Sequence, residues 1–164
     1  MTSSTLSLPA VSQFGAVSAG PASTDHFPFI TLAVRSLEAS VRFYQVLFDR
    51  LPVRADPDQA LFSLDDPPLA VLLSPDEGAV ARDGHVGIQL KYSSDVARIQ
   101  ERLVQSGYAI DMEETEASCC FSVANKVWVS DPDRNLWEVY VLIAENATEV
   151  RCGDSCACEA GGCG

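Results

Sequence analysis

The chain has few basic side chains and lacks any long apolar run. It carries 11 Lys and Arg against 23 Asp and Glu, which gives a formal net charge of -12 at pH 7. A field of this sign repels phosphate backbones and anionic lipid headgroups, so neither nucleic acid nor a membrane surface is expected as a partner. No stretch reaches the roughly 18 to 20 consecutive apolar residues that a bilayer-spanning helix needs. We therefore expect a soluble protein.

Cysteine is absent from the first 118 residues. The six cysteines fall into an adjacent pair, Cys119 and Cys120, and a terminal group, Cys152, Cys156, Cys158 and Cys163. This distribution is unlike a disulfide framework and favours binding of soft metals in a reducing cytoplasm. The terminal group lies among Gly and Ala, which cannot build a core, so a disordered tail with incidental thiols is the alternative interpretation.

The composition of both ends of the chain predicts flexible segments. Residues 1–27 are rich in Ser, Ala, Thr and Pro, without the basic start and apolar run of a secretory signal, and we expect a flexible extension. Residues 148–164 form the Cys-rich tail, which we also expect to be flexible. The remaining residues, 28–147, are enough for one buried core, so we predict a single domain. The distribution of the cysteines, described above, predicts that it is cytoplasmic.

A strand pattern followed by a helix pattern occurs twice in this domain. Residues 29–34 and 85–90 alternate as strands do. Apolar residues then recur at helical spacing after each strand, at Leu37, Val41, Tyr44 and Phe48 and again at Val96, Ile99 and Leu103. Further short strands are predicted at 59–64, 69–73, 126–130 and 136–142. Asp-Pro turns precede the last strand of each half.

The two halves align as an internal repeat. Phe29 matches His85 at an offset of 56, and Leu69 matches Leu136 at an offset of 67, so the second half holds about eleven extra residues that include Cys119 and Cys120. Chance similarity of two amphipathic units is the alternative. The repeat predicts an α+β fold of two paired βαβββ modules related by a pseudo-two-fold axis, with the site in the cleft between them.

His85 and Glu138 are the candidate metal ligands of this fold. His85 opens a strand, and Glu138 lies between apolar neighbours in the last strand, where a carboxylate is costly unless it is paired, protonated or metal-bound. Metal binding is the simplest neutralisation, and one His with one Glu makes two thirds of a facial triad. The alternative for His85 is a core histidine with satisfied hydrogen bonds.

The repeat places the third ligand on Phe29, which cannot bind a metal. The nearby donors are His26, three residues earlier on the opposite strand parity, and Thr31, a weak oxygen donor on the correct face. His26 is therefore the candidate substitute.

The adjacent thiols point to a second kind of ligand. Two neighbouring thiolates close reluctantly on each other but readily on a large soft atom such as As(III), Sb(III), Cd(II) or Hg(II). The alternative is that Cys119 and Cys120 are two small core residues. Trp128 and Trp137 are expected to pack in the core, with Trp128 or Tyr140 as possible walls of the pocket.

Several segments of the chain carry a family resemblance. They are residues 36–40 with Phe43 and Tyr44, then 66–69, 84–89, 118–121, 126–132 and 137–140. With these motifs the chain resembles the ArsI carbon-arsenic lyases and the cadmium-induced CadI-like proteins of the glyoxalase/bleomycin-resistance superfamily, which have the vicinal oxygen chelate fold. The resemblance covers residues 29–145.

The resemblance implies an Fe(II)- and O2-dependent lyase that releases arsenite from trivalent organoarsenicals such as methylarsenite. It implies that His85 and Glu138 hold the iron and that Cys119 and Cys120 hold the arsenic. The family's first-strand ligand, Gln or His, falls on Phe29. The alternative is a non-catalytic protein that sequesters As(III), Sb(III) or Cd(II) with its six thiols, the terminal cysteines acting as auxiliary ligands. Both alternatives allow a monomer or a homodimer.

Overall fold

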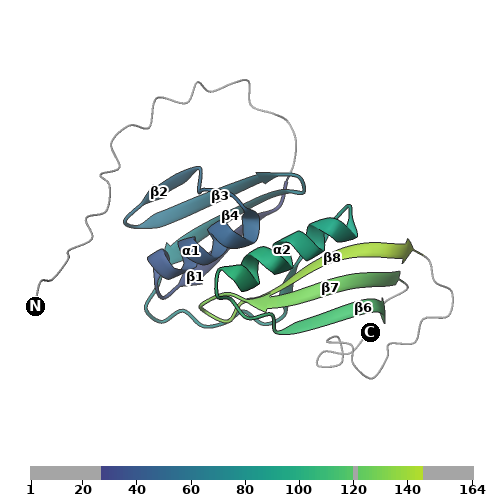
Figure 1. The fold of residues 1–164 in the computed structure, drawn as a ribbon. Helices are drawn as coiled ribbons and strands as arrows, with labels where there is room; N and C mark the ends of the chain where they lie inside the picture. The colour runs from purple at the N-terminus through teal and green to yellow at the C-terminus, as the bar shows by residue number, and fades with distance from the viewer. Residues whose placement is uncertain (1–26, 120–121, 146–164) are drawn as a thin grey trace, which may run out of the picture.

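The computed structural model describes residues 27–119 and 122–145, which form two modules of one helix and four strands each (Figure 1). The first module contains β1 (Phe29–Val34), α1 (Leu37–Phe48), β2 (Arg54–Asp56), β3 (Gln59–Asp65) and β4 (Pro68–Pro75). The second contains β5 (His85–Leu90), α2 (Ser93–Gln105), β6 (Met112–Cys119), β7 (Ser122–Ser130) and β8 (Leu136–Glu145). Of the predicted extension, residues 1–27, only Phe27 is described, and the predicted Cys-rich tail lies outside the described residues.

Each module folds into a mixed sheet with the same strand order. The orders are β1-β4-β3-β2 and β5-β8-β7-β6, with the first pair parallel and the others antiparallel. The α+β fold of two βαβββ modules is thereby confirmed. The extra residues of the second half lengthen the β6–β7 hairpin, whose strands have 8 and 9 residues against 3 and 7 in β2 and β3.

The strand register corrects the predicted repeat by one residue. Phe29 pairs with Ala70 in the first module, and His85 pairs with Leu136 in the second. Ala70, not Leu69, is therefore the counterpart of Leu136, and the offset of the last strands is 66. Since adjacent strand residues point to opposite faces, this shift decides which side chains are equivalent. Leu72 is the first-module counterpart of Glu138.

Both helices cover the same side of the sheets (Figure 1), and Phe29 and His85 on the other side are exposed. The apolar stripe of α1 buries Phe43, Tyr44 and Leu47, which join residues of both sheets in one core cluster. Ser36 begins α1 by accepting a hydrogen bond from the Ala39 amide, as an N-cap residue does. Arg102 of α2 donates to the carbonyl oxygens of the last turn of α1 at 2.6 and 3.0 Å, which joins the modules.

A buried polar cluster fastens α1 to the loop before β8. The Tyr44 hydroxyl donates to Asp131 Oδ2 at 2.7 Å and accepts from Trp137 Nε1 at 3.1 Å. Asp131 also accepts from Asn135 at 2.7 and 2.8 Å, which shapes the turn into β8. Burial, and then the charge of Asp131, raise the pKa of Tyr44 well above its ordinary value. The cluster thus connects the first module to the strand that carries Glu138.

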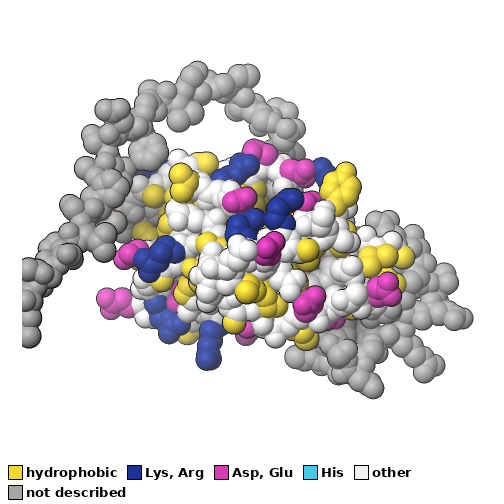
Figure 2. Space-filling view, viewed as in Figure 1, with side chains coloured by type: hydrophobic (Ala, Val, Ile, Leu, Met, Phe, Trp, Pro, Cys, Tyr) yellow, Lys and Arg dark blue, Asp and Glu magenta, His cyan; other side chains and the backbone are white. Residues whose placement is uncertain are grey.

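Among the described residues, no helix is long and apolar enough to cross a bilayer. Acidic and basic side chains intermix on the helix side of the molecule (Figure 2).

We predict that Tyr44→Phe lowers the free energy of unfolding by about 1 to 3 kcal/mol, because Asp131 and Trp137 each lose a buried hydrogen-bond partner. Urea unfolding at neutral pH measures this loss. A raised pKa in the folded state means that the stabilisation is complete below the unfolded pKa of about 10 and declines as pH rises above it. Wild-type stability should therefore fall more steeply above this pH than that of Tyr44→Phe. If the stability of the wild type and of Tyr44→Phe falls equally steeply above this pH, the pKa of Tyr44 is not raised.

Candidate metal site on the second sheet

His85 and Glu138 come together on the open face of the second sheet. Because β5 and β8 are parallel, with Gly87 opposite Glu138, both side chains point to the same face from adjacent strands. His85 Nε2 lies 3.3 Å from Glu138 Oε2, and the side chains are 40% and 13% exposed. We expected the two residues to face each other across the cleft. They are instead neighbours within one sheet.

Gly87 leaves the room that this arrangement needs. A Cβ atom at this position would lie 3.3 Å from the Tyr140 ring and 3.5 Å from Glu138 Oε2. Tyr140 borders the carboxylate on the same strand face, and its hydroxyl donates to Gln89 Oε1 at 3.3 Å. Partial burial, and then the charge of Glu138, raise the pKa of Tyr140. Tyr140 therefore borders the carboxylate as a neutral phenol at neutral pH.

Lys126 is a member of this cluster that the sequence reasoning missed. It lies on β7, an inner strand of the sheet, and its ammonium is 3.0 Å from Glu138 Oε1, with side-chain exposures of 8% and 13%. The carboxylate that we expected a metal to neutralise is thus already balanced by a cation. Lys126 interrupts an otherwise apolar strand pattern at 126–129, and that interruption was the available signal.

The ring of Trp128 packs against the imidazole of His85. The rings of Trp128 and His85 meet edge to face with centroids 4.9 Å apart, and Trp128 is only 2% exposed. Its indole Nε1 donates to Glu114 Oε1 at 2.6 Å, which fixes the orientation of the ring. Trp137, in contrast, is fully buried against Tyr44 and Phe48 of α1. The indole of Trp128 belongs to the site, and that of Trp137 belongs to the core.

The two donors fit neighbouring positions of one metal ion. Ligand atoms about 2.1 Å from a metal and at right angles to each other are about 3.0 Å apart, close to the observed 3.3 Å. In the described part of the chain, no three His, Cys, Asp or Glu side chains are grouped closely enough to hold a metal. The first-module counterparts of His85 and Glu138 are Phe29, which is 58% exposed, and Leu72. Neither can ligate a metal.

The predicted arsenic ligands lie away from this pair. Cys119 ends β6 and pairs with Ser122, whereas Glu138 pairs with Trp128. The six residues from Trp128 to Ser122 span roughly 20 Å of strand. The structure therefore does not bring the backbone of Cys119 next to Glu138. His26, Cys120 and the cysteines of the tail lie outside the described residues.

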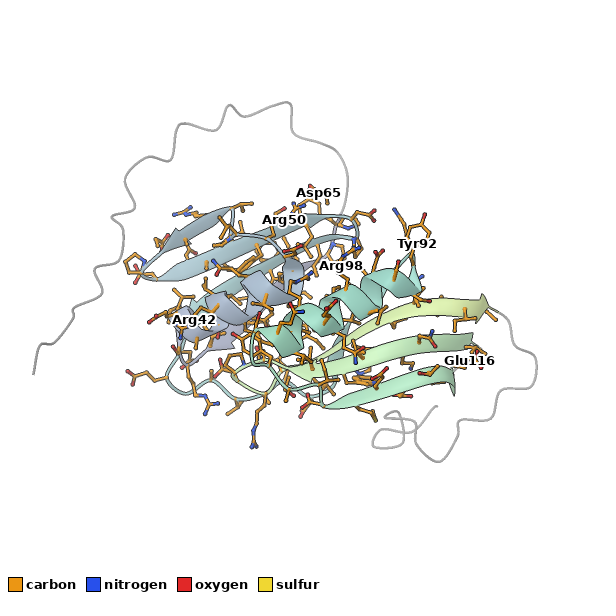
Figure 3. The ribbon with its side chains drawn as sticks, viewed as in Figure 1. Arg42, Arg50, Asp65, Tyr92, Arg98 and Glu116 are labelled. Atoms are coloured by element: carbon orange, nitrogen blue, oxygen red, sulfur yellow. The ribbon has the colours of Figure 1, made fainter. Side chains whose placement is uncertain are left out.

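Hollows of different size border the described modules, and the small one beside β5 contains a candidate ligand. A hollow of about 60 Å³ adjoins His85 and is lined by Arg82, Gly84 and Asn135 among others. A larger one of about 200 Å³ lies at the module junction, where Arg50, Asp65 and Arg98 flank it (Figure 3). All three of these side chains are in ion pairs, with Arg50 bound to Asp65 and Arg98 to Asp95. We assign the candidate site to His85 because the ligand atoms converge there.

We predict that Glu138→Gln lowers the free energy of unfolding by about 1.5 to 3 kcal/mol, since it removes the charge that faces the Lys126 ammonium. Lys126→Met should have a comparable cost. The double variant should be less destabilised than the two single variants added together. Asp66→Asn is the matched control, because the Lys91–Asp66 pair is 66% exposed at both ends and its loss should leave the free energy of unfolding nearly unchanged. If urea unfolding shows that the double variant loses as much free energy of unfolding as the two single variants together, Lys126 and Glu138 are not a coupled pair.

Comparisons with known proteins agree with the fold and with the motifs. The chain is 38% identical over 130 residues to a trivalent organoarsenical cleaving enzyme of Thermomonospora curvata, covering 79% of this chain and 85% of that protein. It is 34% identical over 119 residues to the cadmium-induced protein CadI of Mycobacterium bovis, covering 73% and 78%.

Solved structures show the same architecture. The fold matches a glyoxalase-related enzyme from Fulvimarina pelagi with a TM-score of 0.55 at 24% identity, covering 71% of this chain and 87% of that one. Residues 26–139 match the profile of one large protein family. The chain belongs to the Glyoxalase/Bleomycin resistance protein/Dioxygenase superfamily.

Proposed function

We propose that the protein is an Fe(II)- and O2-dependent lyase that cleaves the carbon-arsenic bond of trivalent organoarsenicals. The observation that carries the proposal is the convergence of His85 Nε2 and Glu138 Oε2, 3.3 Å apart, on the open face of the second sheet. The relative from Thermomonospora curvata, an organoarsenical cleaving enzyme, supports the substrate class. A detoxifying role in arsenic resistance follows from this chemistry.

In this proposal each residue of the cluster has a separate task. His85 and Glu138 would hold the ferrous ion, which supplies the activation of dioxygen when bound. Trp128 holds the imidazole in place through its edge-to-face contact. Gly87 keeps the space beside the carboxylate open. Cys119 and Cys120 would bind the arsenic, and His26 is the candidate for the third protein ligand.

Two observations favour a second function, thiol-based sequestration of As(III), Sb(III) or Cd(II) without catalysis. The Lys126–Glu138 ion pair balances the carboxylate without a metal. The backbone of Cys119 is roughly 20 Å of strand away from the level of Glu138, whereas catalysis needs substrate and metal in close contact. The likeness to a cadmium-induced protein fits this function as well.

Arsenite release separates the two functions. The protein is loaded with Fe(II) without oxygen, mixed with methylarsenite and then exposed to air, and arsenite is measured by chromatography with elemental detection. We predict arsenite release by the wild type and release at background level by His85→Ala and Glu138→Gln. Lys91→Met, an exposed substitution, should leave release unchanged. Binding of methylarsenite without release by the iron-loaded wild type would establish sequestration.

The thiols provide a second test. Methylarsenite has two exchangeable positions, so Cys119 and Cys120 satisfy it, whereas free arsenite gains a further bond from a third thiol. We predict that changing Cys152, Cys156, Cys158 and Cys163 to Ser weakens arsenite binding more than methylarsenite binding. The Cys119→Ser, Cys120→Ser double variant should bind neither. Titration calorimetry under reducing conditions measures both affinities. An unchanged methylarsenite affinity in the double variant would exclude Cys119 and Cys120 as the substrate ligands.

A further inference from the structure

The two carboxylate oxygens of Glu138 have different partners. Oε1 lies 3.0 Å from the ammonium of Lys126, and Oε2 lies 3.3 Å from the imidazole of His85. The carboxylate is therefore oriented with one oxygen toward β7 and the other toward β5. A metal ion beside His85 meets only the second oxygen.

The surroundings of Lys126 hold the ammonium in this position. Lys126 and Glu138 are 8% and 13% exposed, so water and salt screen their attraction little. The ammonium also lies 5.8 Å from the centroid of the Trp128 ring, within the range of a cation-π contact. In the strand register Lys126 pairs with Tyr140 and Glu114, which places it in the middle of the sheet. A lysine placed in this way is a fixed part of the cluster.

We propose that Lys126 is a positioning residue that restricts Glu138 to one metal-binding oxygen. This inference rests on the proposed metal site. A carboxylate binds a cation through one oxygen or through both, and the second mode occupies an additional coordination position. By retaining Oε1, Lys126 keeps that position open for an exogenous ligand. Partners of this kind, one step removed from the metal, commonly set the orientation of a ligand.

The binding mode can be measured in the wild-type protein by infrared difference spectroscopy on addition of Co(II). One-oxygen binding separates the asymmetric and symmetric carboxylate stretches widely, whereas two-oxygen binding brings them close together. We expect a wide separation in the wild type, in a signal that is absent from Glu138→Gln. A narrow separation would overturn the role of Lys126 while leaving the metal site intact. No Glu138-dependent signal on Co(II) addition would overturn the metal site itself.

Variants of Lys126 test whether this residue causes Glu138 to bind through one oxygen. Lys126→Met should narrow the separation and bind Co(II) about tenfold more tightly, because the competing cation is gone. Lys126→Arg keeps the cation and should keep the wide separation. Lys91→Met, which removes an exposed lysine paired with Asp66, is the matched control and should match the wild type. Identical spectra and affinities for Lys126→Met and the wild type would contradict the proposal. If Lys126→Met does not fold, the spectra of the wild type and of Lys126→Arg still test the proposal, because a narrow separation of the carboxylate stretches in either would contradict it.

Discussion

The parallel register of β5 and β8 is the constraint on which the candidate site depends. His85 pairs with Leu136, and Gly87 pairs with Glu138. The imidazole and the carboxylate therefore project from the same face, with Glu138 two residues beyond the strand partner of His85. A shift of one residue would send the carboxylate into the helix-covered core. The cluster around Tyr44 and Asp131 holds the turn that begins β8, so packing of the first module stabilises the position of Glu138 in the second.

The pseudo-symmetry of the fold does not extend to its chemistry. The second module presents His85, Glu138 and Lys126 on its open face, whereas the corresponding positions of the first module hold Phe29 and Leu72 where His85 and Glu138 would be. The site is therefore polar on one sheet only, and the proposed metal site has no third His, Cys, Asp or Glu ligand among the described residues.

Local periodicity was enough to predict much of the fold from sequence. The strands at 29–34 and 85–90 and the apolar stripe of α1 match the structure, because each pattern reports on residues close in the chain. The repeat offset was wrong by one, since pairing between distant strands is not encoded in either strand alone. Lys126 was missed for the same reason: its partner Glu138 is twelve residues away across a turn, and only the register brings them together. The metal ligands and the thiols remain predictions.

The central claim is that His85 and Glu138 bind one metal ion independently of the thiols. Cadmium NMR on protein with isotope-labelled histidine tests it directly, because cadmium reports whether nitrogen and oxygen or sulfur surrounds it. The chain has only two histidines, so a comparison of the wild type with His85→Ala identifies the signal that comes from His85. We predict a nitrogen- and oxygen-type cadmium signal coupled to His85 that persists when all six cysteines are changed to Ser and disappears in Glu138→Gln. A cadmium signal of purely thiolate type, with His85 unaffected, would contradict the account.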